Sequence, residues 1–141
     1  MDFWTEIYSY FKQTQLVHLA SVDGNKPRLR PVTLIYFKQK FWFATGSNDA
    51  KVKQIYNNNN IEFCLNLKGE KSSGYIRGSG NAHIVKNIKD KILIADNIEF
   101  IKHFWQDPAD PDFVLFNIEL QEIEYLPIGQ MLAARKKVEQ V

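Results

Sequence analysis

Two arginines on one predicted strand are candidates for binding phosphate. Arg28 and Arg30 are two residues apart in the segment Arg28–Leu34, so on a strand both side chains would project from the same face, beside Val32. The planar guanidinium group can donate two hydrogen bonds to one phosphate. A solvated strand end with two ordinary surface arginines would show the same pattern, so the pair alone does not decide between these interpretations.

A second candidate anion site follows the next apolar run. Residues 45–51 read Thr-Gly-Ser-Asn-Asp-Ala-Lys, which places the hydroxyl groups of Thr45 and Ser47 before a predicted helix and Lys51 in its first turn. Main-chain N–H groups at a helix N-terminus attract anions, and a nearby ammonium group adds to the attraction. The glycine spacing excludes a Walker phosphate loop. A turn followed by an ordinary capped helix would give the same sequence.

The surrounding pattern predicts a small β-structure that positions both segments. Turn-bounded apolar runs, several of them alternating with polar residues, predict strands at 16–22, 28–37, 39–45, 61–68, 74–85 and 113–126. Helical spacing predicts helices at 2–13, 49–56, 87–95 and 98–105, with Asp2, Asn87 and Asn97 as caps. Six short strands with few inserted helices indicate a mainly β fold, a β-barrel with helical additions.

Irregular positions are expected in the last two strands. Gly78 and Gly80 interrupt the strand at 74–85, which is typical of a bulge, a barrel bend or the close approach of a ligand. The apolar phase of the closing strand shifts near Gln121, which predicts a bulge there. Glu119, Glu122 and Glu124 are expected on a solvated face of this strand, and Arg135, Lys136 and Lys137 in a peripheral, solvated tail.

Composition predicts one soluble globular domain over residues 1–141. The chain is 45% hydrophobic and 24% charged, and its length supports an unassisted core. Its 18 basic and 16 acidic residues are too evenly balanced to indicate nucleic acid. No apolar run approaches the ~20 residues of a membrane helix, and acidic residues near the start argue against a signal peptide. A single cysteine, Cys64, cannot form an internal disulfide, which favours the cytoplasm.

The sequence predicts neither a metal site nor a nucleophilic cysteine. His18, His83 and His103 are far apart and lack the spacing of a metal-binding motif. Cys64 has no evident base beside it. No residue is therefore nominated as a catalytic acid, base or nucleophile.

The order of six short segments resembles the pyridoxamine 5′-phosphate oxidase-like family of FMN-binding split barrels, in particular its general stress protein 26-like branch. The segments are residues 18–24, 27–32, 41–47, 51–55, 78–82 and 110–115, and the resemblance covers about residues 1–126. It implies a six-stranded antiparallel split β-barrel of the Greek-key type. It also implies a homodimer, with one FMN in each of two clefts between the subunits.

The resemblance assigns cofactor-binding residues by position. Arg30 and Lys51 would hold the FMN phosphate, and Ser47, Asn48 and Arg28 would compensate for missing ligands. The strand from Arg30 to Thr33 would line the flavin, and the next strand would contact it as well. Tyr75 would lie near the ring and Trp105 near the partner subunit. The predicted cofactor-binding residues are Arg28, Arg30, Pro31, Val32, Thr33, Ala44, Thr45, Ser47, Lys51, Tyr75 and Trp105.

The sequence departs from the family pattern at positions that affect phosphate and substrate binding. Asp49 stands where many stress-protein relatives carry serine, and Ala50 where the true oxidases carry arginine. A carboxylate disfavours a nearby phosphate, and the lost arginine removes a bidentate donor. The basic pair that binds pyridoxal phosphate in the true oxidases does not follow the closing strand.

The leading hypothesis is an FMN-dependent oxidoreductase of a small molecule that the sequence does not identify, and not a true pyridoxamine phosphate oxidase. One alternative is a module that holds flavin or haem for storage, sensing or stress response without turnover. The other is a dimeric scaffold without a cofactor.

Overall fold

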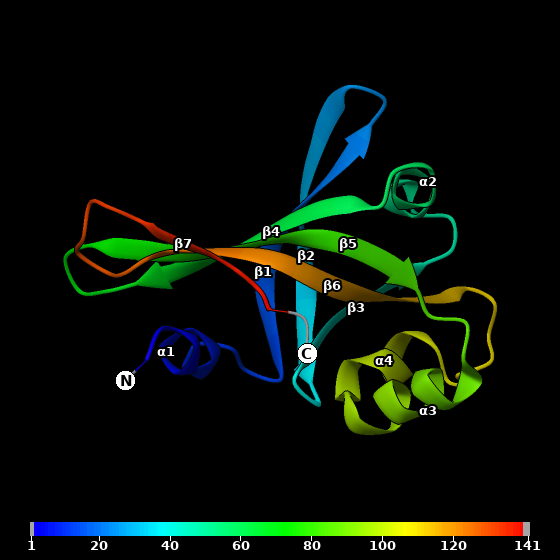
Figure 1. Cartoon of the computed structure of the whole chain (residues 1–141). Coiled ribbons are helices and arrows are strands. Elements are labelled where there is room, and N and C mark those ends of the chain that lie inside the picture. Colours follow the sequence, from blue (N-terminus) through cyan, green and yellow to red (C-terminus); the bar gives the residue numbers. More distant parts are fainter. Residues whose placement is uncertain (1, 140–141) are drawn as a thin grey trace.

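Six antiparallel strands form a closed β-barrel in the computed structural model, which describes residues 2–139 (Figure 1). The strands follow the order β3-β2-β1-β4-β5-β6, and β3 also pairs with β6, which closes the barrel. This architecture confirms the predicted fold class. The strands are β1 (Thr14–Asp23), β2 (Lys26–Phe37), β3 (Lys40–Gly46), β4 (Asn60–Lys68), β5 (Ser73–Ile84) and β6 (Phe113–Leu126).

The alternating pattern of the strands fills the barrel interior. In β4, the odd-numbered residues from Ile61 to Leu67 are buried, whereas the residues between them are half-buried or exposed. Phe43, Phe63 and Leu19 are fully buried in the same core cluster. Removing this apolar surface from water is the main favourable contribution to the stability of the barrel.

Four helices are attached to the barrel: α1 (Phe3–Ser9), α2 (Ala50–Asn57), α3 (Ile88–Asn97) and α4 (Glu99–Phe104). The predicted caps Asp2 and Asn87 are confirmed, because their side chains accept hydrogen bonds from Thr5 N and Lys89 N. The prediction for Asn97 is wrong. Asn97 is the last residue of α3, and the fully buried Ile98 takes the cap position of α4 without a side-chain hydrogen bond.

Helices α3 and α4 lie side by side against the barrel (Figure 1) and bury a second apolar cluster. Leu34 on β2 belongs to the barrel core, whereas its neighbour Ile35 packs with Trp42, Ile98 and Ile101 in this second cluster. Because neighbouring strand residues point to opposite faces, one segment of β2 serves both cores. The second cluster fixes α4 beside β2 and β3.

The bulge predicted near Gln121 is confirmed. Ser79 pairs with Glu122 and Gly80 with Leu120, so Gln121 is skipped in the strand register, although its side chain donates a hydrogen bond to Asn81 on β5. Up to Ile118, β6 pairs with β3, and from Glu122 to Tyr125 it pairs instead with a seventh strand, β7 (Ala134–Lys137).

The two predictions for the C-terminal charges are wrong in part, because Glu119 is exposed as expected but Glu124 is not. Glu124 is buried, with 8% of its surface exposed, and accepts hydrogen bonds from Tyr75, Arg77 and Arg135. Residues 134–137 are exposed as predicted, but they form the strand β7 and not a peripheral tail, since β6 offers them a free edge where β3 has ended. Arg135 also pairs with Glu122 at 3.2 Å, so the acidic residues of β6 hold β7 in place.

Candidate functional site

A cleft of about 470 Å³ opens between β2, β3, the first turn of α2, and α4. It forms where the segment 28–34 of β2 has β1 on one side only, because β3 pairs with β2 only from Ile35 to Phe37. Of the predicted cofactor-binding residues, six line this cleft: Pro31, Val32, Thr33, Ala44, Lys51 and Trp105.

Aromatic side chains of α4 and of the residue that follows it form one wall of the cleft. Phe100 is half-buried, Phe104 is 72% exposed, and Trp105 is buried and stacks on Phe113 with 5.1 Å between ring centroids. Sequence reasoning missed Phe100 and Phe104 as site residues. Their only signal was the aromatic content of the predicted helix at 98–105.

Asp112 joins the two sides of the cleft and was also missed. Its Oδ2 accepts a hydrogen bond from Trp105 Nε1 at 2.9 Å, and its Oδ1 accepts from Ser47 N at 2.9 Å and from Ser47 Oγ at 2.8 Å. These donors, with Trp105 first, lower the pKa of Asp112 below its ordinary value. The sequence feature that could have indicated Asp112 as a site residue is the segment 110–115, in which Asp112 immediately precedes a predicted strand.

Lys51 is the cation of the cleft lining and lies against Asp49. Its side chain is 9% exposed, and its Nζ lies 2.9 Å from Asp49 Oδ2. Asp49 Oδ1 accepts the Lys51 main-chain N–H at 3.0 Å and so caps α2. Partial desolvation raises the pKa of Asp49, but the hydrogen bonds from Lys51 and the charges of Lys51 and Arg30 outweigh it and leave this pKa below its ordinary value.

Arg30 supports the cleft from behind and does not line it. Its guanidinium group donates to Leu19 O at 3.3 Å and, at 2.8 Å each, to Ser21 Oγ and Gln54 Oε1. Because Gln54 belongs to α2, these contacts tie β2 to the helix that carries Lys51. Desolvation lowers the pKa of Arg30, and the charge of Asp49 acts in the opposite direction.

Four other predicted residues lie outside the cleft lining. Arg28 pairs with Asp23 at 3.2 Å near the exposed end of the β1–β2 hairpin, which projects from the barrel (Figure 1). Thr45 is buried, and Ser47 contacts the cleft only through Asp112. The Tyr75 hydroxyl donates to Glu124 at 2.8 Å. Within one chain, the structure therefore does not bring these residues to the cleft.

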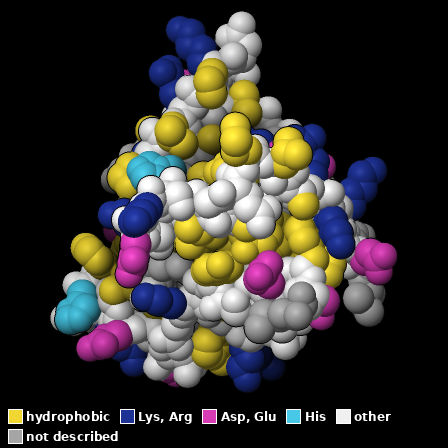
Figure 2. Space-filling model, turned by 90° about the vertical axis from the view of Figure 1, so that its left-hand side faces the viewer, with side chains coloured by type: hydrophobic (Ala, Val, Ile, Leu, Met, Phe, Trp, Pro, Cys, Tyr) yellow, Lys and Arg dark blue, Asp and Glu magenta, His cyan; other side chains and the backbone are white. Residues whose placement is uncertain are grey.

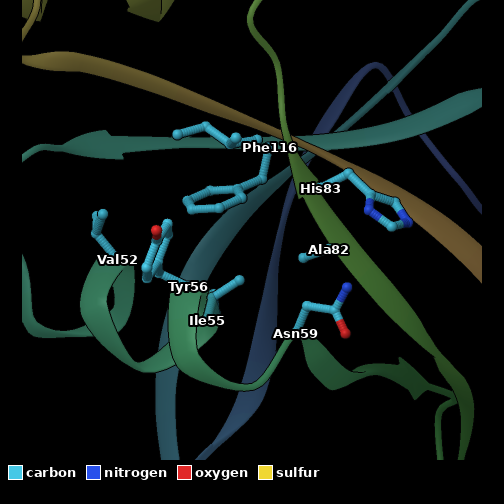
Figure 3. Close-up of a pocket in the computed structure, with 8 residues that line it drawn as sticks. Val52, Ile55, Tyr56, Asn59, Ala82, His83 and Phe116 are labelled. Atoms are coloured by element: carbon cyan, nitrogen blue, oxygen red, sulfur yellow. The ribbon is translucent and has the colours of Figure 1, made fainter.

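A second, smaller hollow of about 190 Å³ lies between α2 and the ends of β5 and β6. Figure 3 shows Val52, Ile55 and Tyr56 on the helix, facing Phe116. His83 points away from the helix and lies 3.0 Å from Glu119. The lining is mainly apolar, apart from Asn59, His83 and the hydroxyl group of Tyr56, and includes no predicted cofactor-binding residue.

Three features of the described residues concern metal binding, membrane-spanning helices and the cysteine. Within residues 2–139, no three His, Cys, Asp or Glu side chains lie close enough together to hold a metal ion. The helices of the same range are all too short or too polar to span a membrane. Cys64 is a half-buried free thiol whose pKa is raised, chiefly by desolvation.

Comparison with known proteins places this barrel in a family. A family model described as pyridoxamine 5′-phosphate oxidase matches residues 3–127. The chain belongs to the pyridoxamine 5′-phosphate oxidase family. This confirms the resemblance inferred from the order of the six segments.

The chain is similar in sequence to one protein of known name and similar in fold to several solved structures. General stress protein 26 of Bacillus subtilis (strain 168) is 26% identical over 115 residues, which cover 79% of each chain. The structure of General Stress Protein 26 from Bacillus anthracis str. Sterne superimposes with a TM-score of 0.77 at 22% identity, covering 98% of this chain and 100% of that one. A heme binding protein from Mycobacterium smegmatis shares the fold, with a TM-score of 0.73 at 12% identity, over 89% of this chain and 53% of its own.

Proposed function

We propose that this chain is a cytoplasmic FMN-binding oxidoreductase that acts on a small molecule other than pyridoxamine phosphate, and that it functions as a homodimer. The observation that carries the proposal is the composition of the cleft, which joins an apolar and aromatic wall to the buried Lys51 at the start of α2. FMN has the matching chemistry, with a flat ring system at one end and a phosphate at the other.

The residues present fit such a ligand. Val32, Ala44 and the aromatic residues of α4 offer apolar surface to the ring system, and a cleft of about 470 Å³ is in the range of small-molecule sites. Lys51 and the N-terminal turn of α2 offer positive charge to the phosphate. Bound FMN would supply hydride or electron transfer, while the protein binds and orients it.

The outer face of the sheet supports a homodimer in which the cleft is shared. Cross-strand register places Pro31 opposite His18 and Thr33 opposite Leu16, so these cleft residues continue into an outer face formed by β2 and β1. Leu16 and Leu29 on this face are 63% and 69% exposed. A second copy that covers them would also border the cleft. Hydrophobic side chains are also exposed below the projecting hairpin on the side shown in Figure 2.

Titration of the purified protein with FMN, followed by flavin absorbance and fluorescence, tests the proposal. We expect saturable binding, and a loss of at least about tenfold in affinity in Lys51→Ala, because Asp49 would then face the phosphate without its partner. Lys53→Ala is the matched control, since Lys53 is an exposed lysine of the same helix that does not line the cleft. Absence of FMN binding would contradict the proposal.

Two further measurements test turnover and assembly. Reduction of the bound flavin by NADH or NADPH, followed by reoxidation, distinguishes an oxidoreductase from a carrier. Sedimentation equilibrium tests the homodimer, and Leu29→Glu is expected to weaken it by placing a charge on the outer face. A monomeric wild-type protein that still binds FMN would contradict the shared cleft.

Haem is a second candidate because a heme binding protein shares the barrel. Haem iron takes His, Cys, Met or Tyr as an axial ligand, and no such residue lines the cleft within residues 2–139. The cleft therefore supports FMN better than haem. Titration with haemin, followed by the Soret band, provides the direct comparison.

A further inference from the structure

We infer that Asp49 sets the preference of the cleft between phosphorylated and unphosphorylated flavins, by pairing with the ammonium group that would otherwise bind the phosphate. The inference rests on the proposed function and concerns the affinity of the same cleft. It assigns to Asp49 a role in specificity in addition to its role as a helix cap.

The Asp49 carboxylate makes contacts of the kind that a bound anion would make. It accepts a main-chain N–H at the start of α2 and lies 2.9 Å from Lys51 Nζ, which are two of the contacts that a phosphate would make there. The Lys51 side chain is only 9% exposed, so little of it remains available to a further partner. A phosphate must displace Asp49 from Lys51 or bind beside a carboxylate.

The remaining charges do not favour a dianion. Arg30 is committed to three protein acceptors, on Leu19, Ser21 and Gln54. Asp112 places a carboxylate in the lining of the cleft, and Asp49, which is not part of the lining, pairs with Lys51. The charge of Lys51 is thus offset by two carboxylates, and the net attraction for a phosphate is small.

This balance predicts that the phosphate adds little to binding by the wild-type protein. FMN and riboflavin share the ring system and the ribityl chain and differ in the phosphate, so the ratio of their affinities measures its contribution. We expect this ratio to lie within a few-fold of one in the wild-type protein.

Asp49→Asn provides the test, because asparagine keeps an oxygen that can cap α2 while it removes the charge. Both flavins are titrated against the wild type and the variant by fluorescence quenching at low and high salt. In the variant, we expect the FMN affinity to rise at least about tenfold at low salt and less at high salt, with the riboflavin affinity unchanged within twofold. Glu70→Gln is the control, since it makes the same change in net charge at an exposed position in the turn between β4 and β5.

The outcomes separate this inference from the proposed function. A ratio that Asp49→Asn leaves unchanged, or that Glu70→Gln changes equally, overturns the role of Asp49 while FMN binding itself stands. A wild-type protein that strongly prefers FMN over riboflavin also overturns it. If neither protein binds either flavin, the proposed function fails and the inference fails with it.

Discussion

Trp105 and Asp112 are joined across one end of the cleft by a hydrogen bond of 2.9 Å from Trp105 Nε1 to Asp112 Oδ2. The other oxygen of the same carboxylate accepts two hydrogen bonds from Ser47, in the loop between β3 and α2. A single side chain therefore holds α4 and the loop before Lys51 at a fixed separation. The width of the cleft depends on this link.

Replacing Asp112 should loosen both walls of the cleft. In Asp112→Ala, Trp105 and Ser47 lose their shared acceptor, so we expect the Tm to fall by a few degrees and the FMN affinity to fall about tenfold. Asp112→Asn keeps one acceptor oxygen and should lose less of both. Differential scanning calorimetry and flavin titration measure the two effects. Wild-type values for Asp112→Ala would show that the link does not hold the cleft.

Glu124 should contribute more to stability than its neighbour Glu122. Glu124→Gln removes the charge from a buried group that pairs with Arg77 and Arg135, and we expect it to lower the free energy of unfolding by about 1–3 kcal/mol. Glu122→Gln removes one partly exposed ion pair with Arg135 and should cost less than about 1 kcal/mol. Urea unfolding measures both, and equal losses would contradict the burial of Glu124 as the cause.

The protein should lose stability in acid. The pKa values of Asp49, Asp112 and Glu124 are lowered in the folded state from ordinary values of 3.8, 3.8 and 4.5. Carboxylates of this kind stabilise the fold fully above the ordinary values, and the contribution is lost as the pH falls through the lowered ones. Urea unfolding at a series of pH values should therefore show a free energy of unfolding that is constant between about pH 5 and pH 8 and declines below pH 5. In Glu124→Gln, the free energy of unfolding should decline less steeply with falling pH. A slope equal to that of the wild type would contradict a contribution of Glu124 to the acid sensitivity.

Gly80 and Gly78 should differ in their tolerance of a methyl group. A Cβ on Gly80 would lie 2.0 Å from the main-chain oxygen of Glu119, which cannot move without disrupting the bulge. A Cβ on Gly78 would lie 2.6 Å from the Phe63 ring, and a side chain can shift. We expect Gly78→Ala to destabilise by about 1–3 kcal/mol and Gly80→Ala by more. Thermal unfolding measures the stabilities of the two variants. A Gly80→Ala protein more stable than Gly78→Ala would contradict this prediction.

Local pattern was sufficient to predict the barrel. Strict alternation marked the strand after Asn60, and a phase shift in the closing strand located the bulge at Gln121. The prediction failed where tertiary contacts outweigh local preference. Asn97 is a good cap by composition, but the burial of Ile98 between α3 and α4 decides where α4 begins. Residues 134–137 have no apolar alternation, and they form a strand because β6 presents a free edge and two carboxylates.

The candidate site could be predicted in part. The family resemblance was sufficient to predict Pro31, Ala44 and Lys51 as residues of the cleft. They lie on β2, β3 and α2, which follow one another in the chain, so the order of the segments already indicates that these residues are close together. Phe100 and Phe104 come from a helix that the second apolar cluster brings to the cleft, and no local pattern reports such long-range packing. The sequence raised Asp49 as a departure from the family, but the contact that engages Lys51 emerged only from the structure.

Closure of the barrel has a consequence for the order of folding. The β3–β6 pairing joins residues 41–46 to residues 113–118, which are separated in the chain by α2, β4, β5, α3 and α4. Contacts of such high sequence separation form slowly, because loop-closure entropy opposes them. Ala44 lies on β3 and Asp112 directly precedes β6, so the cleft does not exist in a chain whose barrel is still open. Ligand capture during refolding would therefore report the final closure of the barrel and not the formation of its individual hairpins.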